Sequence, residues 1–393
     1  MYICGETGVG KTTLLHNLMV QDIHDGKGFA FFDPHGDEAE NLLNFIPQHR
    51  VEDVIYFAPH DRERPVIFNP LNQLRVEVQG DDTEENKDRR TTEDQERIVQ
   101  AIANAFRAIW PDTYGTSNMQ YILTSLFLTT LQVEGATFQT ARKILIDPSY
   151  RAHILGAISD EDILSFWRDE WDKFSERERS TFSWSTRNKL GQFTLFKTLK
   201  NVLCRESSFS MKEIMNGQKI FIANLSIGHL GGIHSQILGC LLFSLMQAAT
   251  MERAKTKFRI PFTIYLDEFQ TFINPELADM LSQARKYKVA LVLANQYLAQ
   301  LTEEVKDAVF GNVGTIVSYR VGKDDAEYLS KHFEEYPKKN FLELEQMQSM
   351  ARFLYRGNKH ECKIRADEYD DRECGRARQV ISNSRERYGV KVK

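Results

Sequence analysis

Eight residues near the start of the chain, GETGVGKT, have the residue types and the spacing of a phosphate-binding loop. Glycines let backbone N–H groups close around phosphate oxygens, and the helix that follows adds its dipole. Lys11 would contact the β- and γ-phosphates, Thr12 would place its hydroxyl on Mg²⁺, and Thr13 would contact the α-phosphate. The sequence therefore predicts a site for ATP and Mg²⁺ formed by Gly5, Thr7, Gly8, Gly10, Lys11, Thr12 and Thr13.

An acidic pair follows an apolar stretch in FTIYLDEF. The stretch reads as a buried strand, so Asp267 and Glu268 would lie at its carboxyl end, where ligands bind in open α/β sheets. We expect Asp267 to hold Mg²⁺ through water and to contribute to the nucleotide site, and Glu268 to polarise an attacking water. An acidic strand end without a role is the alternative. A water-activating Glu also disfavours a small-molecule kinase.

Three further polar residues are candidates for the same chemistry. Gln296, after Asn295 in LVLANQ, could sense the γ-phosphate or orient the water, or could cap a helix. Arg285 could act as an arginine finger across a subunit boundary. Arg320 ends a predicted strand and could face the nucleotide or form a salt bridge.

The elements that must position these residues alternate between helices and fully apolar strands. That alternation indicates an α/β fold with a mostly parallel, twisted sheet covered on both faces. The pattern breaks at a charge-dense stretch and then becomes helical only, which predicts an inserted all-α domain. The expected order is an ATPase domain over 1–75, a charged surface segment over 76–95, the insert over 96–205, the ATPase domain again over 206–371, and a loosely held basic tail over 372–393.

Composition places the chain among ordinary globular proteins. The net charge of −5 argues against a wholly basic surface but permits a basic channel. The apolar run 233–250 contains His, Ser and Gln and is short for a membrane span, so we expect a buried helix, no membrane contact and a cytoplasmic location. His35, in the turn DPHGD, fits a turn beside the nucleotide better than a metal site. Phe166, Trp167, Trp171 and Phe174 fit core packing, with base stacking the remote alternative.

The motifs MYICGETGVGKTTLL, FFDPHGD, YLDEFQTF and ARKYKVALVLANQYLAQL, in this order, resemble the HerA/FtsK superfamily of DNA-pumping ATPases. The conjugative coupling proteins of TraG/TraD type, of type IV secretion, are the branch they resemble most. The resemblance implies a RecA-like P-loop fold, a homo-hexameric ring with ATP at subunit interfaces, and DNA in the central channel. Relaxase and secretion-channel proteins are implied as possible partners. On this pattern the matching residues are Lys11 and Thr12 of the phosphate loop, the acidic pair Asp267 and Glu268, the sensor Gln296 and the arginine finger Arg285.

The family also raises a question about the start of the chain. Its members usually carry a membrane-spanning or barrel-like domain before the phosphate loop, and the parent protein could be anchored at the inner membrane. Only MYIC precedes the loop here, so we expect an incomplete first strand with Met1 frayed or at an exposed edge. Besides a coupling-protein motor, two functions stay open: a DNA end-processing or packaging ATPase, and a non-motor ATP-binding switch or scaffold for secreted proteins.

Overall fold

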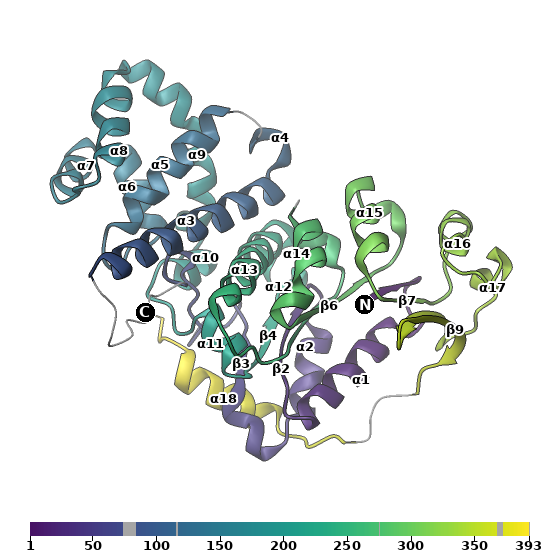
Figure 1. Cartoon of the computed structure of the whole chain (residues 1–393). Helices are drawn as coiled ribbons and strands as arrows, with labels where there is room; N and C mark the ends of the chain where they lie inside the picture. The colour runs from purple at the N-terminus through teal and green to yellow at the C-terminus, as the bar shows by residue number, and fades with distance from the viewer. Residues whose placement is uncertain (74–83, 115–116, 275, 368–371, 393) are drawn as a thin grey trace. The chain divides into compact units, whose positions relative to one another are not determined.

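The computed structural model describes residues 1–73, 84–114, 117–274, 276–367 and 372–392 (Figure 1). The chain divides into two compact units. Unit 1 comprises Met1–Ala58, Ile214–Ser235 and Thr250–Glu386, and unit 2 comprises Pro59–Glu213, Gln236–Ala249 and Arg387–Lys393. The domain boundaries given above stay predictions, and residues 76–83 of the expected charged segment lie outside the described residues.

Unit 1 is built on a nine-stranded sheet with the order β3-β4-β2-β5-β6-β1-β7-β8-β9. Neighbouring strands from β3 to β7 in this order run parallel, whereas β8 and β9 add an antiparallel hairpin. The predicted mostly parallel α/β sheet is confirmed. The strands are β1 (Tyr2–Cys4), β2 (Gly28–Asp33), β3 (Val54–Phe57), β4 (Ile220–Asn224), β5 (Phe262–Leu266), β6 (Val289–Asn295), β7 (Thr315–Ser318), β8 (Gln348–Tyr355) and β9 (Asn358–Arg365).

Helices pack on both faces of this sheet. On one face, α1 contributes Leu15 and Met19 to a core that includes Phe31 of β2. On the other face, the ring of Phe310 in α15 lies 5.3 Å from that of Tyr2 in β1. The helices lying wholly within unit 1 are α1 (Lys11–His24), α2 (Asp37–Leu42), α12 (Ile227–Leu230), α14 (Leu277–Gln283), α15 (Glu303–Asn312), α16 (Lys323–Ser330) and α17 (Lys338–Leu342), whereas α11 (Met211–Asn216), α13 (Gly232–Glu252) and α18 (Ala377–Tyr388) cross its boundaries.

Strand β1 is short but lies inside the sheet, between β6 and β7. Its three residues are fully buried and pair with both neighbours. The amino group of Met1 donates a hydrogen bond of 2.6 Å to Leu291 O, and burial lowers the pKa of this ammonium to about 6. The expectation that Met1 frays or lies at an exposed edge is therefore wrong for this structure, because its amino group is held by a hydrogen bond to β6.

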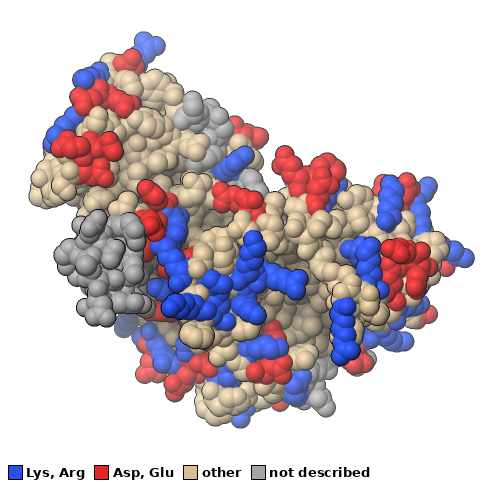
Figure 2. Space-filling view, viewed as in Figure 1, with Lys and Arg blue, Asp and Glu red and all other residues tan. Residues whose placement is uncertain are grey.

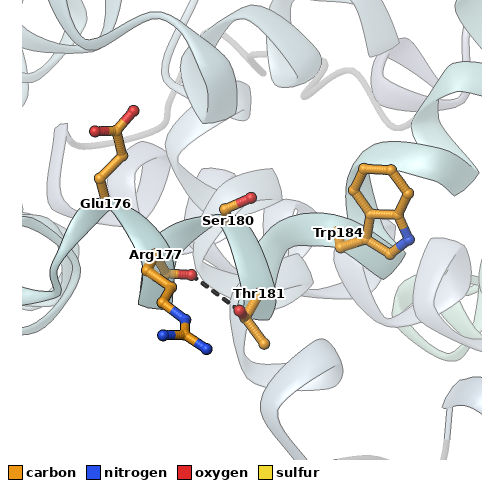
Figure 3. A pocket seen from close by; sticks show the side chains of 5 residues that line it. All are labelled: Glu176, Arg177, Ser180, Thr181 and Trp184. Carbon is orange, nitrogen blue, oxygen red and sulfur yellow. Dashed lines mark hydrogen bonds between the residues drawn. The ribbon is translucent and has the colours of Figure 1, made fainter.

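Unit 2 is dominated by helices. Phe166, Trp167 and Trp171 are at most 5% exposed, so core packing is confirmed for them. The exposed tryptophan of this unit is Trp184, at 62%, which lies at one end of a shallow hollow along α9 (Figure 3). The helices are α3 (Glu84–Ile109), α4 (Pro111–Tyr114), α5 (Ser117–Leu131), α6 (Phe138–Ile146), α7 (Pro148–Leu155), α8 (Glu161–Ser165), α9 (Glu176–Leu195) and α10 (Lys197–Leu203).

The basic C-terminal segment differs from expectation, because most of it forms the helix α18. Val380 is fully buried in the core of unit 1, and Ser384 Oγ accepts a hydrogen bond of 2.9 Å from Tyr56 N. Helix α18 thus covers part of the edge strand β3 rather than lying loose.

Lys and Arg side chains are spread over the face drawn in Figure 2, with a concentration near its centre.

Among the described residues, one stretch, Gly232–Lys255, has the length and apolar composition needed to cross a membrane. In its most apolar window 72% of the residues are buried inside the protein. This burial agrees with the expected buried helix, since core helices commonly meet the same criterion.

Candidate nucleotide-binding site

The phosphate-loop sequence forms a tight turn between β1 and α1. Gly8 and Gly10 have φ values of 77° and 114°, in the region that glycine adopts without strain. A Cβ atom on Gly10 would also lie 2.7 Å from Met347 Sδ. The backbone conformation therefore favours glycine at position 10, and a larger residue would also force Met347 to move. Helix α1 begins immediately afterwards at Lys11.

Lys11 is held inside the loop that it follows. Its Nζ donates hydrogen bonds to Gly5 O at 2.6 Å and to Glu6 O at 2.9 Å. Burial lowers the pKa of Lys11, and the negative charges of Glu268 and Asp267 oppose that effect. The ammonium therefore lies within the electrostatic reach of both acidic residues.

A cleft of about 240 Å³ opens over the loop. Most of the predicted site residues line it, although they come from distant parts of the sequence. The predicted residues in its wall are Thr7, Gly8, Gly10, Lys11, Thr12, Thr13, Asp267, Glu268 and Gln296. Gly5 is not in the wall and instead accepts the hydrogen bond from Lys11.

The acidic pair lies at the end of β5 and is almost completely buried, with Asp267 5% and Glu268 8% exposed. Burial, and next the charges of Glu268 and Asp33, raise the pKa of Asp267 to about 7. Two buried carboxylates beside a loop that suits phosphate are a fitting set of oxygen donors for Mg²⁺, because a divalent cation would offset their repulsion. Asp267 and Thr12 fit the role of holding it.

Glu268 has a constrained position. Its backbone φ is 45°, which is uncommon for a residue with a side chain and is found repeatedly at functional sites. Gln296 Nε2 donates a hydrogen bond to Glu268 Oε1 at 3.0 Å, and Gln270 Nε2 donates one to Oε2 at 2.8 Å. The carboxylate is thus fixed by two side-chain amides, with Gln296 also facing the cleft.

Asn295, the residue before Gln296, does not line the cleft. It is fully buried, where its Oδ1 accepts a hydrogen bond of 2.8 Å from the Tyr2 hydroxyl. Its Nδ2 donates to Tyr297 O at 2.9 Å. Asn295 therefore ties β6 to β1, and Gln296 is the amide placed at the site.

The two predicted arginines lie outside the cleft wall. Arg320 is exposed beside the loop, where its Nε donates to Glu6 Oε2 at 3.0 Å and its carbonyl accepts from Glu6 N at 2.9 Å. Arg285 is exposed and precedes the amino end of β6, whereas the cleft lies at the carboxyl end. Seven strand residues span about 20 Å, so Arg285 does not reach the cleft of its own chain.

Three residues in or beside the cleft were not identified from the sequence. Gln270 could have been identified, because it lies only two positions after Glu268 in the sequence. Gln346 and Met347 line the cleft from the segment before β8. Gln346 Nε2 donates to Gly8 O at 3.2 Å, and Met347 N donates to Val9 O at 2.9 Å. No local motif marks these two, since only the sheet order brings them to the loop.

The DPHGD turn borders the cleft through His35. Asp33 Oδ1 accepts a hydrogen bond from His35 N, and its Oδ2 accepts one from Ala39 N in α2, both at 2.8 Å. The Asp33 carboxylate therefore shapes the turn and caps the start of α2.

Comparison with known proteins bears on this geometry. Residues 261–358 match the family model described as the TraM recognition site of TraD and TraG. The resemblance to TraG/TraD-type coupling proteins is confirmed. This match covers β5, β6, β7 and β8 and thus the acidic pair and Gln296. A search of curated proteins found no match.

Solved structures of the coupling protein TrwB and of VirB4 share the fold. The plasmid coupling protein TrwB with the GTP analogue GDPNP superposes with a TM-score of 0.60 at 16% identity, over 93% of this chain and 85% of that one. Unbound TrwBdeltaN70 superposes with a TM-score of 0.62 at 16% identity, over 96% of this chain and 87% of that one. VirB4 of Thermoanaerobacter pseudethanolicus superposes with a TM-score of 0.60 at 14% identity, over 94% of this chain and 90% of that one. The RecA-like architecture expected from the sequence is therefore confirmed.

Proposed function

We propose that this chain is an ATPase motor of the conjugative or type IV secretion coupling-protein type, which hydrolyses ATP to move DNA. One observation carries the proposal. The carboxylate of Glu268 is buried, held by Gln270 and Gln296, and faces the cleft formed by the phosphate loop. A fixed carboxylate opposite a phosphate loop is the arrangement that nucleotide hydrolysis needs.

ATP with Mg²⁺ is the proposed nucleotide. TrwB has been crystallised with a non-hydrolysable ATP analogue and with ADP and Mg²⁺, which supports these ligands for a chain of the same fold. Backbone N–H groups of the loop would bind the phosphates, and the Lys11 ammonium would exchange its loop carbonyl partners for phosphate oxygens. Bound Mg²⁺ would neutralise charge on the phosphates, with Thr12 and Asp267 holding it.

Hydrolysis would depend on Glu268. Its carboxylate would accept a proton as water attacks the γ-phosphate, and general-base assistance contributes about 10²–10⁴-fold to rate. The amides of Gln296 and Gln270 would keep both carboxylate oxygens in place, and Gln296 would also orient the water or contact the γ-phosphate.

Arg285 and Arg320 have different proposed roles. Since Arg285 does not reach the cleft of its own chain, a catalytic role requires that it serve the nucleotide of a neighbouring subunit. That role fits a homo-hexameric ring with ATP at the interfaces. Arg320, paired with Glu6 at the loop, would face the nucleotide from the same chain.

The proposed substrate is DNA that passes through such a ring. The family model names a TraM recognition site, so a TraM-like component is a proposed partner of residues 261–358, beside relaxase and secretion-channel proteins. A cytoplasmic location, with a parent protein anchored at the inner membrane, is part of the same proposal.

Nucleotide binding and turnover test the proposal. Lys11→Ala should lose ATP binding by titration calorimetry. Glu268→Gln should keep binding but lose about 10²–10⁴-fold in phosphate release, because the amide preserves shape but accepts no proton. Glu343→Gln, in an exposed residue next to α17, is the control and should behave as wild type. Normal turnover of Glu268→Gln would refute the assignment.

A further inference from the structure

Two basic segments meet at the amino ends of β5 and β6. RAKTKFRI, over 253–260, precedes β5, and ARKYK, over 284–288, precedes β6. Together they hold seven Lys or Arg residues and no Asp or Glu. We call them the basic edge. The chain as a whole is acidic, with a net charge of −5, so the concentration is local.

The basic edge has a defined structure, because two arginines fix it from inside. Arg253 Nη1 donates to Tyr287 O at 2.9 Å, and its Nη2 donates to Ile260 O. Arg259 Nη1 donates to Lys286 O at 3.1 Å, and its guanidinium lies 5.5 Å from the centre of the Tyr287 ring. These contacts join the two segments.

Lys257, Lys286 and Lys288 are exposed, and within the described part of the chain none forms an ion pair. Lysines before two other strands differ. Lys27, before β2, pairs with Asp22 and Asp25, and Lys219, before β4, pairs with Asp53. Lys257, Lys286 and Lys288 therefore keep their positive charge available, whereas acidic partners neutralise Lys27 and Lys219.

Phe258 is 91% exposed, between Lys257 and Arg259. An exposed aromatic ring among cations is the combination that binds single-stranded nucleic acid, because cations contact phosphates and the ring stacks on an unpaired base. Insertion into a membrane surface requires a broad apolar face, whereas the large apolar side chains exposed on the basic edge are Phe258 and Ile260, the latter 36% exposed. The exposed side chains of the basic edge thus favour a nucleic acid over a lipid surface as its ligand.

We propose that the basic edge is a contact site for single-stranded DNA, with Lys257, Lys286 and Lys288 on phosphates and Phe258 stacked on a base. This inference rests on the proposed function, in which DNA is the substrate, and it names residues for that contact. The site lies at the opposite ends of the strands from the cleft of the same chain. Arg285, proposed to serve a neighbour's nucleotide, is therefore left unchanged in the test.

Fluorescence anisotropy with a labelled 30-nucleotide poly-dT tests the site on the full chain. Replacing Lys257, Lys286 and Lys288 by Ala together should weaken binding about 10- to 100-fold near 0.1 M salt and reduce the slope of log K against log salt by about 2. Arg at the same three positions should retain binding. Phe258→Ala should weaken binding at least about fivefold, and Phe258→Trp should restore it.

A matched control removes three lysines from elsewhere in unit 1. Lys338, Lys339 and Lys359 pair with Glu327, Glu343 and Glu334, and their triple Ala variant should bind poly-dT nearly as wild type does. Equal loss in the control and in the basic-edge variant would refute the site, because it would reflect overall charge alone.

Further outcomes separate this inference from the proposed function. Wild-type affinity in the basic-edge variant overturns the contact site and leaves the motor proposal standing. Failure of the wild-type chain to bind any DNA overturns both. If Phe258→Ala binds poly-dT as tightly as the wild type, and the wild type binds duplex DNA as tightly as poly-dT, the assignment to single strands is overturned. Loss of binding to phosphatidylglycerol vesicles, with DNA affinity unchanged, would assign the surface to lipid instead.

Discussion

Glu268 and Gln296 are joined by a hydrogen bond of 3.0 Å, from the amide nitrogen of Gln296 to Oε1 of Glu268. The two residues follow adjacent strands, β5 and β6, and both line the cleft. Gln270 donates to the second oxygen at 2.8 Å. In the proposed reaction the base is therefore set in position before nucleotide binds, and its two partners can be tested separately.

Removing the amide of Gln296 should slow turnover more than it weakens binding. A hydrogen bond to a charged group contributes about 1.5–3 kcal/mol, which corresponds to roughly 10- to 100-fold in kcat. Gln296→Ala should show this loss with little change in ATP affinity. Gln270→Ala should be milder, since Gln270 is not in the cleft wall. An equal fall in affinity and rate for Gln296→Ala would contradict a positioning role.

Gly10→Ala should abolish nucleotide binding. The added Cβ would lie 2.7 Å from Met347 Sδ, and the φ of 114° is unfavourable for alanine. Gly26→Ala is the control, because its φ of 74° is also left-handed but no atom lies within 4 Å of the new Cβ. Calorimetry should show lost ATP binding in the first variant and near-normal binding in the second. Normal binding by Gly10→Ala would contradict the closeness of Met347 to the loop.

Asp267→Asn should stabilise the nucleotide-free protein, and more so at higher pH. The pKa of Asp267 is about 7 in the folded protein against an ordinary 3.8, so folding becomes less favourable as pH rises between these values. The difference corresponds to at most roughly 4 kcal/mol. Thermal unfolding in EDTA should show a larger gain in Tm at pH 8 than at pH 5. An equal gain at both pH values would show that Asp267 is not a buried, repelled carboxylate.

Arg285→Ala should act on neighbouring subunits if Arg285 serves their nucleotide. Its position at the amino end of β6 rules out its own cleft, so its loss would be felt across an interface. Mixing the variant with wild type should reduce ATPase activity more than in proportion to the variant fraction. A linear fall would argue against action between subunits, and Lys339→Ala serves as a control for the loss of an exposed positive charge elsewhere in unit 1.

The parts of the site that the sequence could predict are those contained in short motifs. The phosphate loop and the Asp267–Glu268 pair are contiguous, and their flanking strands are apolar enough to be recognised. Gln346 and Met347 could not be predicted, because they reach the loop only through the pairing of β1 with β7 and of β7 with β8.

The fold was predictable in outline for a similar reason. Strands made mostly of apolar and aromatic residues, such as β2 and β5, indicate a covered parallel sheet. Helix α18 was missed because its few apolar residues made the segment read as a tail, although Val380 and Ser384 have the helical spacing of four and both are buried. The position of the Met1 amino group depends on its hydrogen bond to Leu291 in β6, which the first residues do not reveal.

The central claim, that ATP hydrolysis moves DNA, is tested most directly by displacement of streptavidin from the biotinylated end of a single-stranded DNA, with a duplex of the same length run in parallel. The wild-type chain is added with ATP or with a non-hydrolysable analogue, the Glu268→Gln variant is added with ATP, and release of streptavidin is followed over time. The account predicts release only by the wild-type protein with ATP. A protein that binds DNA and hydrolyses ATP but releases streptavidin from neither track would contradict a motor and would favour a switch or scaffold.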